Sequence, residues 1–417
     1  RAPIQKLADT VSSYFVPAVV AVSVGTAIVW MVFGPEPAFT FAMVNAVAVL
    51  IIACPCALGL AAPISIMVAT GRAATMGILF RNAEAIEAMK GIEVLIVDKT
   101  GTLTTGVMKV NDVLIPTSAQ KALGSQIAGS INERMILSTA LTLESANDHP
   151  IAKAISSYSI SRGATLAALT DFTQTPGSGV GGRIKVGDFS PVVLIGTPEA
   201  IAHSSVPFDP QIEAGIEQAR FRGESVSVLA WDGVALALFT TSDEVKDDAA
   251  ETITALIDRG ITPWLVTGDN KESANHIASL VGIPASNVIA HTLPQEKLKV
   301  VEDFKAQGKT VLMIGDGIND AAALAGADLS IAMGTGTDSA IGSADITLMR
   351  PGLMGVVGAL KLATRTLKTI KVNLGWAFAY NVIGIPIAIA GALTPMYAAA
   401  AMAASSLVVV TNSLRIR

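Results

Sequence analysis

The chain has 417 residues, of which 51% are hydrophobic and only 15% are charged, and its mean hydropathy is +0.55. This composition is too apolar for an ordinary soluble enzyme of this length and indicates membrane helices. The formal net charge of −5, without a basic patch that carries interleaved aromatic residues, argues against a nucleic-acid partner. The two cysteines lie two positions apart in one hydrophobic run, which excludes a disulfide framework and favours a thiolate metal site.

Apolar segments near both ends of the chain predict two membrane hairpins, because a bilayer span needs about 20 apolar residues as a helix. The first hairpin covers Phe15–Gly34 and the uncharged stretch 37–71. The second lies in the uncharged stretch between Lys371 and Arg415. Glycine and proline breakers at 34–37 and 391–395 predict the two outer turns.

Lysine and arginine residues predict the orientation of these hairpins. They flank the ends that join the large middle region, whereas neither outer turn contains one. By the positive-inside rule the middle region is cytoplasmic. We therefore expect an integral, multi-pass protein of the plasma membrane, which in bacteria is the inner membrane, with membrane lipid around its helices.

The middle of the chain, from residue 91 to about 350, predicts an α/β domain. Short β-branched runs alternate with amphipathic stretches such as 244–258, a pattern typical of a parallel sheet covered by helices on both faces. Ligands bind beyond the carboxyl ends of the strands in such sheets, and Asp98, Thr267 and Asp316 lie there. The expected strands are Val94–Val97, Pro263–Val266, Val311–Ile314 and Leu329–Ala332.

The stretch from about 107 to 240 has a different pattern. Helices near 132–145 and 149–162 come first, short strands with glycine-rich turns follow, and strands at 226–231 and 234–240 end the stretch. Because this insertion separates the first α/β strand from the others, we expect a second, α+β domain joined by two linkers.

The run from Asp98 to Thr104, Asp-Lys-Thr-Gly-Thr-Leu-Thr, is the most specific signal in the soluble region. A carboxylate at the end of a buried strand, followed by a polar turn with a glycine, can attack a phosphoryl group and hold the acyl phosphate. Together with Thr-Gly-Asp at 267–269 and Gly-Asp-Gly-Ile-Asn-Asp at 315–320, this run resembles the haloacid dehalogenase-like superfamily and, more narrowly, the P-type ATPases.

The resemblance implies that Asp98 is the nucleophile that becomes phosphorylated, and that Asp98, the Thr100 carbonyl and Asp316 hold Mg²⁺. Simple phosphatases of the superfamily place a second Asp two residues after the nucleophile, as a general acid/base. Here Thr100 stands at that position, after Lys99. Without a local proton-transfer group the aspartyl phosphate is expected to persist, as a pump requires when its intermediate must outlive a conformational change.

The resemblance also assigns the groups around the phosphate. Thr267 and Lys297 would neutralise the phosphoryl oxygens, and Asn319 and Asp320 would complete the phosphate and metal shell. This set suits phosphoryl transfer, which depends on in-line positioning and on cations more than on covalent help from the protein.

The inserted domain carries Glu144, His149 followed by proline, and Gly-Ser-Gly at 177–179. These features resemble the nucleotide-binding domain of the heavy-metal P-type ATPases, where a Glu, a His-Pro and a Gly-x-Gly contact the adenine end of ATP. The family usually has Ser-Glu before the His-Pro, whereas this chain has Asn-Asp at 147–148. The alternative role of His149 is a helix cap. The residues that the resemblance implies for ATP are Glu144, His149, Gly177, Gly179, Gly268 and Asp269.

Cys54-Pro55-Cys56 lies in a stretch that is free of charge for many residues on either side. A proline in mid-helix removes a backbone hydrogen bond and opens the helix, which is tolerated in a membrane only where the break lines a cavity or packs on protein. Two thiols at such a break are soft ligands that suit Cu(I), Ag(I) or thiophilic divalent ions. Two ordinary core cysteines are the alternative.

The last two predicted helices favour Cu(I) as the metal. They contain no Asp, Glu, Lys or His between Lys371 and Arg415, and a dehydrated divalent ion would normally need a carboxylate partner there. Cys-Pro-Cys, Tyr-Asn and Met-x-x-Ser-Ser together resemble the Cu(I)-exporting branch of the family, whereas a Zn²⁺/Cd²⁺ exporter would show a Lys and an Asp. The implied Cu(I) ligands are Cys54, Cys56, Tyr380, Asn381, Met402 and Ser406.

The resemblance divides the chain into five parts. Residues 1–90 would form a transmembrane hairpin with a cytoplasmic stalk, and 351–417 a C-terminal hairpin. The phosphorylation domain would comprise 91–107 and 241–350, with the nucleotide-binding domain at 108–240 between them.

Related pumps also carry an actuator domain with a Thr-Gly-Glu motif and four further membrane helices before the segment that begins at Arg1. We therefore expect the chain to be the C-terminal part of a pump, with those parts as partners and slow dephosphorylation when it is alone. Copper is expected from a copper chaperone or a low-molecular-weight thiol. Asp9 matches an acidic residue on the copper access route of this branch, and a solvated carboxylate at a helix start is the alternative.

The function expected from the sequence is ATP-driven export of Cu(I), with Ag(I) tolerated, through a phosphorylated Asp98. A Zn²⁺/Cd²⁺-exporting P-type ATPase is the alternative within the same class. From other classes, a membrane-tethered phosphatase and a non-catalytic metal-binding remnant remain open. Metal-dependent uptake of phosphate from ATP by Asp98 distinguishes all of these.

Overall fold

The computed structural model describes residues 3–54, 56–118, 132–175, 177–185 and 190–416. The chain divides into two compact units. One consists of residues 1–94, 301–313 and 324–417 and is called the membrane unit below. The other, residues 95–300 and 314–323, is called the catalytic unit. The finer five-part division expected from the sequence stays a prediction.

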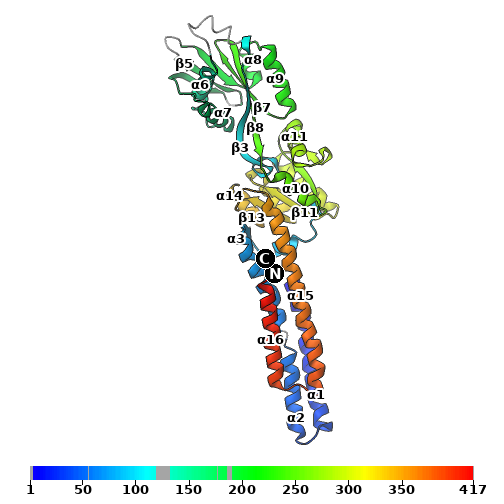
Figure 1. The fold of residues 1–417 in the computed structure, drawn as a ribbon. Helices are drawn as coiled ribbons and strands as arrows, with labels where there is room; N and C mark the ends of the chain where they lie inside the picture. The colour runs from blue at the N-terminus through cyan, green and yellow to red at the C-terminus, as the bar shows by residue number, and fades with distance from the viewer. Residues whose placement is uncertain (1–2, 55, 119–131, 176, 186–189, 417) are drawn as a thin grey trace. The chain divides into compact units, whose positions relative to one another are not determined.

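Long apolar helices make up much of the membrane unit (Figure 1). Four segments of the described chain are long and apolar enough to cross a membrane, as the sequence predicted. Breaks at 34–37 and 390–394 separate the helices where glycine and proline occur. The helices are α1 (Pro3–Phe33), α2 (Ala38–Ile52), α3 (Cys56–Thr75), α15 (Met354–Ile389) and α16 (Pro395–Ser413).

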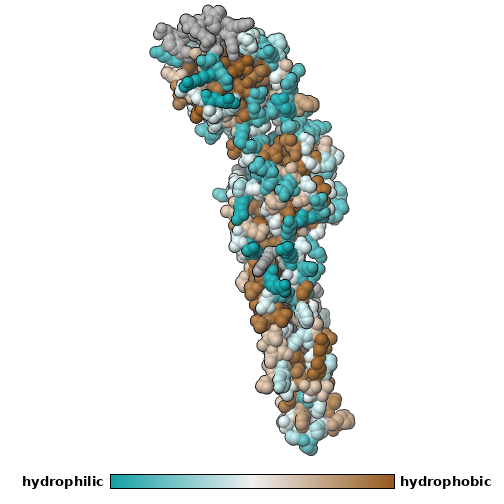
Figure 2. All heavy atoms as spheres, in the orientation of Figure 1, coloured by the Kyte–Doolittle hydropathy of each residue, from teal (hydrophilic) through white to brown (hydrophobic). Residues whose placement is uncertain are grey.

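Two apolar layers hold these helices together, and α3 packs against both α15 and α16. The distal layer, close to the break after α15, consists of Ala48, Val49, Ile52, Ala388 and Ala398. The proximal layer, nearer the other end of the bundle, consists of Ala57, Leu58, Ala61, Ala377 and Val409. Large apolar side chains such as Trp376 and Ile383 instead face outward, and hydrophobic surface runs along these helices in Figure 2. This exposed apolar surface is what lipid would cover.

A seven-stranded sheet has the order β1-β13-β12-β11-β2-β9-β10. Its strands are β1 (Ile78–Phe80), β2 (Val94–Val97), β9 (Thr262–Val266), β10 (Val288–Ile289), β11 (Val311–Gly315), β12 (Leu329–Met333) and β13 (Ile346–Leu348). The four strands expected from the sequence are therefore confirmed. The dividing line between the two units crosses β2 and β11.

One strand departs from the expected parallel arrangement. β1 follows α3 and pairs antiparallel with β13, which lies parallel to β12 and precedes α15. The pairing places Ile78 opposite Leu348. This edge strand links the chain segments of α3 and α15 within the membrane unit.

Helices of this α/β part are α4 (Glu84–Ala88), α10 (Ala249–Ile257), α11 (Lys271–Val281), α12 (Pro294–Ala306), α13 (Ala321–Gly326) and α14 (Asp338–Ser343), with short turns η1 (Lys99–Leu103), η2 (Ala285–Asn287) and η3 (Ile318–Asp320). The helix expected from residue 244 was wrong at its start. Glu244 belongs to strand β8 (Val234–Val245), and α10 begins only at Ala249. The reason is that the end of β8 pairs with the β3 segment, where Val245 lies opposite Thr104.

The inserted part of the catalytic unit is an antiparallel six-stranded sheet of order β3-β8-β7-β6-β5-β4. Alternate residues of β7 show its two faces, since Leu229 and Trp231 pack with α6 and α7 whereas Val228 and Ala230 pack with α8 and α9. The elements are β3 (Thr104–Leu114), α6 (Glu133–Glu144), α7 (Pro150–Ser161), β4 (Leu169–Thr175), β5 (Gly179–Ile184), β6 (Val192–Gly196), α8 (Pro198–His203), α9 (Pro210–Phe221) and β7 (Ser225–Trp231).

Candidate functional site: a buried carboxylate cluster and a helix-borne donor set

Asp98 is positioned by the strand that precedes it. β2 is buried along its whole length, and the Asp98 amide donates to the Ile314 carbonyl of the neighbouring strand at 3.1 Å. Only 7% of Asp98 is exposed. The chain then turns through η1, where Gly101 has a φ of +68° and so takes a conformation that suits glycine.

Lys297 of α12 links two of the acidic residues. Its Nζ donates to Asp98 Oδ1 at 2.6 Å and to Asp320 Oδ1 at 2.7 Å, and 4% of Lys297 and 1% of Asp320 are exposed. Burial, followed by repulsion from Asp320, raises the pKa of Asp98 to about 6, although Lys297 opposes this shift. The carboxylates in turn keep the pKa of Lys297 raised against the effect of burial. The structure therefore places Lys297 beside Asp98, and its role in neutralising the phosphoryl oxygens stays a prediction.

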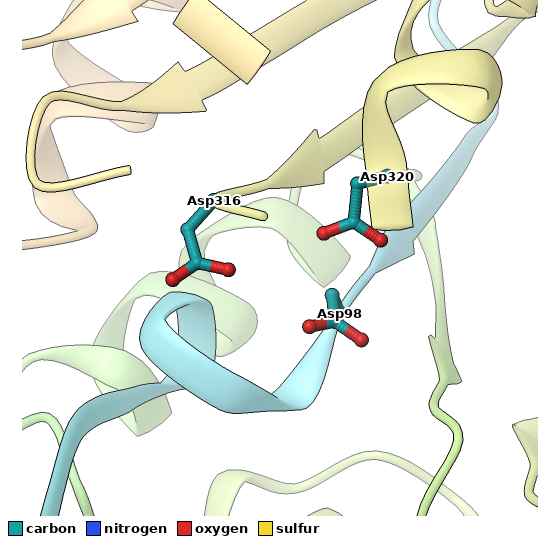
Figure 3. Close-up of side chains that lie close together, drawn as sticks. All are labelled: Asp98, Asp316 and Asp320. Atoms are coloured by element: carbon teal, nitrogen blue, oxygen red, sulfur yellow. The ribbon is translucent and has the colours of Figure 1, made fainter. Parts of the chain in front are cut away.

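Asp316 completes a group of three carboxylates with Asp98 and Asp320. One oxygen from each lies within 4.8 Å of the others, and the three side chains come from the end of β2, the end of β11 and η3 (Figure 3). A Cβ on Gly101 would lie 1.6 Å from Asp316 Oδ2, so only glycine allows this approach. Oxygen donors in such a cluster suit a hard divalent ion such as Mg²⁺. Burial, followed by repulsion from Asp320, raises the pKa of Asp316 to about 6, although Lys246 and Lys297 oppose this shift.

The Thr-Gly-Asp segment follows β9, a strand that neighbours β2 in the sheet. Thr267 is 2% exposed, and its Oγ1 accepts from the Asp269 amide at 3.3 Å. Asp269 forms an ion pair with Lys99, the residue after Asp98. Gly268 is exposed beside them. The segment therefore meets the Asp98 loop through Lys99, as the shared carboxyl end of the strands predicted.

Within the described ranges, two predicted site residues make no side-chain hydrogen bond to the cluster. Thr100 and Asn319 are both exposed, and no hydrogen bond of their side chains is seen among the described residues. Burial lowers the pKa of Lys99, which lies between Asp98 and Thr100. The predicted roles of Thr100 and Asn319 stay predictions.

Residues 98–106, which begin with the predicted nucleophile, are called the nucleophile loop below. Two residues at the end of β8 that the sequence reasoning missed hold this loop in place. Asp243 accepts from Thr104 Oγ1 at 2.5 Å and from the Gly106 amide at 2.9 Å. Lys246 Nζ donates to the Gly101 carbonyl at 2.8 Å. Burial lowers the pKa of Lys246, although Asp248, Asp316 and Asp243 oppose the shift. The only sequence signal was a charged run at the end of an apolar strand, which usually marks a solvated turn.

His149 and Glu144 lie around the start of α7. His149 Nδ1 accepts from the Ile151 amide at 3.3 Å, so the alternative role of a helix cap is observed. Glu144 is 6% exposed and accepts from Asn147 Nδ2 at 3.0 Å. Burial raises the pKa of Glu144 to about 7, and the Asn147 hydrogen bond opposes this shift. Contact of either residue with ATP stays a prediction.

The four predicted adenine contacts do not share one cavity in the described residues. Gly177 and Gly179 line a cavity of about 580 Å³ that neither Glu144 nor His149 lines. His149 lines a second cavity of about 710 Å³, within the catalytic unit, that continues to Lys99, Thr100 and Asp269. This second cavity joins part of the predicted nucleotide site to the nucleophile loop.

The predicted Cu(I) ligands lie between the two apolar layers along α3, α15 and α16. Asn381 is 3% exposed, and its side-chain oxygen has no hydrogen-bond partner among the residues that the structure describes. Tyr380 donates to the Ala398 carbonyl at 3.5 Å, and Met402 and Ser406 are half-buried. Cys54 is half-buried, and a soft metal ion would bind its sulfur as a thiolate. Pro55 and the side chains of Cys56 and Asp9 lie outside the described residues.

Family models for haloacid dehalogenase-like hydrolases match residues 92–328 and 297–360, which include the whole carboxylate cluster. A "Copper-transporting ATPase 1" of Rhizobium meliloti is 45% identical over 425 residues and covers 100% of this chain. The chain belongs to the heavy-metal P-type ATPases, within the haloacid dehalogenase-like family. A "Copper-exporting P-type ATPase" of Mycobacterium tuberculosis is 44% identical and also covers 100% of the chain.

The chain spans about half the length of these relatives, 49% and 51% respectively. Among solved structures, a zinc-transporting PIB-type ATPase in the E2.Pi state has a TM-score of 0.83 at 29% identity, covering 100% of this chain and 64% of that one. The catalytic domain of a CPx-ATPase has a TM-score of 0.54 at 27% identity and covers 70% of this chain and 98% of that one. Membership of this family makes the chain part of an integral membrane protein, in agreement with its four candidate spans.

Proposed function

We propose that this chain supplies the ATP-driven motor and part of the metal path of a pump that exports Cu(I). The main support for the ATP-driven motor is the position of Asp98. It is buried at the end of β2, and its carboxylate lies 2.6 Å from the Lys297 ammonium. The copper assignment is supported by the relatives at 44% to 45% identity over the whole chain, which are a copper-transporting ATPase and a copper-exporting P-type ATPase. It is supported further by the uncharged donor set in the helices.

In the proposed reaction an Asp98 carboxylate oxygen attacks the γ-phosphorus of ATP. A phosphorus–oxygen bond to Asp98 forms while the bond to the leaving ADP oxygen breaks. Lys297 neutralises part of the negative charge that gathers on the phosphoryl oxygens. Thr267 would add a hydroxyl donor from the next strand. Lys99, held by Asp269, lies where the second cavity reaches the loop, so it can meet the incoming phosphates.

Mg²⁺ would be held by Asp98, the Thr100 backbone carbonyl and Asp316. When bound, it neutralises phosphate charge that the protein's own cations leave uncompensated. The chain's contribution is the approach of the carboxylates, which Gly101 permits, and Asp320, which keeps Lys297 in place through a 2.7 Å contact. Asn319 would reach the phosphate only once it is present. Since Thr100 has no acidic group, no neighbouring proton carrier of the phosphatase kind stands beside the acyl phosphate.

The nucleotide-binding role belongs to the six-stranded sheet and its helices. We propose that Glu144, His149, Gly177 and Gly179 receive the adenine end of ATP. The second cavity supports this, because it runs from His149 to the nucleophile loop. Since Gly177 and Gly179 line another cavity, adenine binding requires a rearrangement that brings the two glycines and His149 to one ligand.

Cu(I) is the proposed cargo, with Ag(I) tolerated, bound by Cys54, Cys56, Tyr380, Asn381, Met402 and Ser406. The buried side-chain oxygen of Asn381 has no partner within the described part of the chain, which supports a ligand at this level of the bundle, since buried polar atoms normally have partners. The sulfurs must be reduced, because a soft monovalent ion binds thiolates and not a disulfide. Copper would arrive from a chaperone or a low-molecular-weight thiol.

A Zn²⁺ pump is the second candidate, because a zinc-transporting ATPase is similar over the whole chain. Zinc is a divalent ion that normally takes charged ligands when dehydrated. The stretch between Lys371 and Arg415 carries no acidic residue, which favours Cu(I).

The test is phosphorylation of the complete pump by labelled ATP, with Cu(I) and reductant compared against Zn²⁺. We expect acid-stable label at Asp98 that depends on Cu(I), with none in Asp98→Asn and none in Cys54→Ala/Cys56→Ala. Stimulation by Zn²⁺ alone would replace the cargo assignment. Turnover of small phosphate esters without any metal cargo would instead favour the phosphatase.

A further inference from the structure

A cluster of neutral polar side chains joins three membrane-unit helices at one level. Asn373 of α15 donates to Ser413 Oγ of α16 at 2.9 Å, and Ser413 Oγ lies 3.0 Å from Ser65 Oγ of α3. Asn412 Nδ2 also donates to Asn373 Oδ1 at 2.7 Å. We call Ser65, Asn373, Asn412 and Ser413 the three-helix clamp.

The clamp is among the most deeply buried polar groups of the bundle. Ser65 and Ser413 are 0% exposed, and Asn373 is 1% exposed. Both donor and acceptor atoms of the Asn373 amide are in use, since its Nδ2 additionally reaches the Val409 carbonyl at 3.4 Å. An amide whose donor and acceptor atoms are already hydrogen-bonded has no atom left to bind a ligand, so the clamp is not itself a metal site.

The clamp lies on the same three helices as the predicted metal ligands, one apolar layer away. Ser65 comes nine residues after Cys56, Asn373 seven before Tyr380, and Ser413 seven after Ser406. At a helical rise of about 1.5 Å per residue, these spacings are about 10 to 14 Å on each helix. The proximal layer, which includes Ala61, Ala377 and Val409, fills the interval.

The apolar layer alone does little to stabilise one register of the helices over another. In a bilayer, lipid tails are as apolar as leucine, so helices gain no hydrophobic driving force by packing together. The proximal layer is rich in alanine, whose small side chains allow close approach but interlock weakly. Directional hydrogen bonds between helices do select one rotation and one axial position for each helix.

We propose that the three-helix clamp is a positioning device for the cargo site, which holds α3, α15 and α16 in the register at which their donors converge on one ion. This inference rests on the proposed function for the identity of the site it serves. Asn373, Ser413 and Ser65 are positioning residues in this scheme, because they touch each other and not the ion. Their loss should weaken metal binding while the soluble motor stays intact.

The experiment measures the metal concentration for half-maximal phosphorylation of Asp98 in the complete pump, together with the rate at saturating metal. Ser65→Ala removes one interhelical hydrogen bond, and we expect half-activation at about threefold more Cu(I), the factor that corresponds to ~0.6 kcal/mol per bond. Ser413→Ala removes two such bonds, to Ser65 and to Asn373, and should require about eightfold more Cu(I). Asn373→Leu replaces the amide by an apolar side chain of similar size, and half-activation should require about tenfold more Cu(I) than in the wild type. Ser413→Thr, which keeps a hydroxyl, should restore wild-type half-activation. The saturating rate should stay within twofold throughout.

Thr366→Val is the matched control, because Thr366 is also buried on α15 but its hydroxyl donates to Leu362 of the same helix and, among the described residues, to no other helix. Its half-activation should not change. The clamp proposal is overturned if Ser413→Ala, Ser65→Ala and Thr366→Val all leave half-activation unchanged, whatever they do to thermal stability. It is also overturned if the Ser65→Ala and Ser413→Ala effects simply add, since the two hydroxyls contact each other.

Failure of the proposed cargo would appear separately, in the wild type. If Zn²⁺ and not Cu(I) activates the unmodified pump, the same titrations are done with Zn²⁺, and the same shifts support the clamp. Should Asn373→Leu not accumulate in membranes, the two serine variants carry the test.

Discussion

The nucleophile loop and the three-helix clamp both bury polar side chains almost completely, but with opposite chemistry. Around Asp98 the buried groups are ions, with one ammonium between two carboxylates. In the clamp they are neutral amides and hydroxyls. Glu144 is an intermediate case, because it is a buried carboxyl group that accepts a hydrogen bond from a neutral amide.

The two sites differ because the function and the surroundings of each site select the kind of polar group that is buried there. A phosphoryl group brings several negative charges, so a site that accepts it must hold cations in advance. Charges among membrane helices are costly, and neutral groups can fix a register there without that cost. Removal of one charge should therefore have large effects, and removal of one neutral hydrogen bond small ones.

Replacing Lys297 should have the largest effect. Lys297→Met leaves Asp98 and Asp320 buried without a cation, and we expect phosphorylation by ATP to slow by about 10²- to 10³-fold, as for other electrostatic groups at reaction centres. Rapid-quench labelling measures this rate. Lys297→Arg keeps the charge and should recover part of the activity. A Lys297→Met protein that reacts near the wild-type rate would show that the ion pair is structural only.

Glu144 tests a carboxyl group whose only side-chain hydrogen bond among the described residues comes from the neutral amide of Asn147. Its pKa is raised to about 7, against 4.5 for the unperturbed group, so the folded protein binds more protons than the unfolded chain between these pH values. Stability of the inserted domain should therefore fall as pH rises through this window, by about 3 kcal/mol in total at 1.36 kcal/mol per pKa unit. Hydrogen exchange of the β7 amides at pH 5 and pH 8 measures it.

Glu144→Gln is the control for this pH effect, because glutamine keeps the shape and the contact with Asn147 but does not titrate. Its protection should be nearly independent of pH over the same range. Equal pH dependence in both proteins would assign the effect to another group.

Lys246 tests a charge that acts at one remove from the chemistry. Lys246→Met removes the donor to the Gly101 carbonyl, and we expect phosphorylation about tenfold slower, in line with about 1.5 kcal/mol for a hydrogen bond to a charged group. Lys246→Arg should recover much of the rate. Lys109→Met is the matched control, since Lys109 pairs with Glu244 on the exposed surface and should have little effect. Equal losses in Lys246→Met and Lys109→Met would refute a specific role.

Close packing in the membrane helices should give the smallest effects. A Cβ on Gly384 would lie 2.4 Å from Ile52 Cγ1, so Gly384→Ala should destabilise the bundle by about 1 kcal/mol through overpacking. Adding Ile52→Ala removes the atoms that clash, so the double variant should lose less than the sum of the single ones. Gly375→Ala on the same helix meets open space and should be neutral. Thermal inactivation of the detergent-solubilised pump ranks these variants.

The site could be predicted in unequal parts. Asp98, Lys297, Asp316 and Asp320 were recognised from short motifs, and the structure brings them together because adjacent strands end at one edge of the sheet. Asp243 was not recognised, since its bond to Thr104 spans 139 residues and no local pattern announces such a contact. The separate cavities of His149 and Gly177 were likewise not foreseen, because motifs name residues without their distances.

Local periodicity and composition are enough to predict the apolar spans, the buried strand before Asp98 and the turn after it. These elements depend on properties of neighbouring residues, which the order of amino acids gives directly. The contact of Lys246 with the Gly101 carbonyl, 145 residues earlier, and that of Ser65 with Ser413, 348 residues later, become visible only in the folded structure. Such pairs arise from how whole elements pack, and the same side chains in another packing would simply face water or lipid.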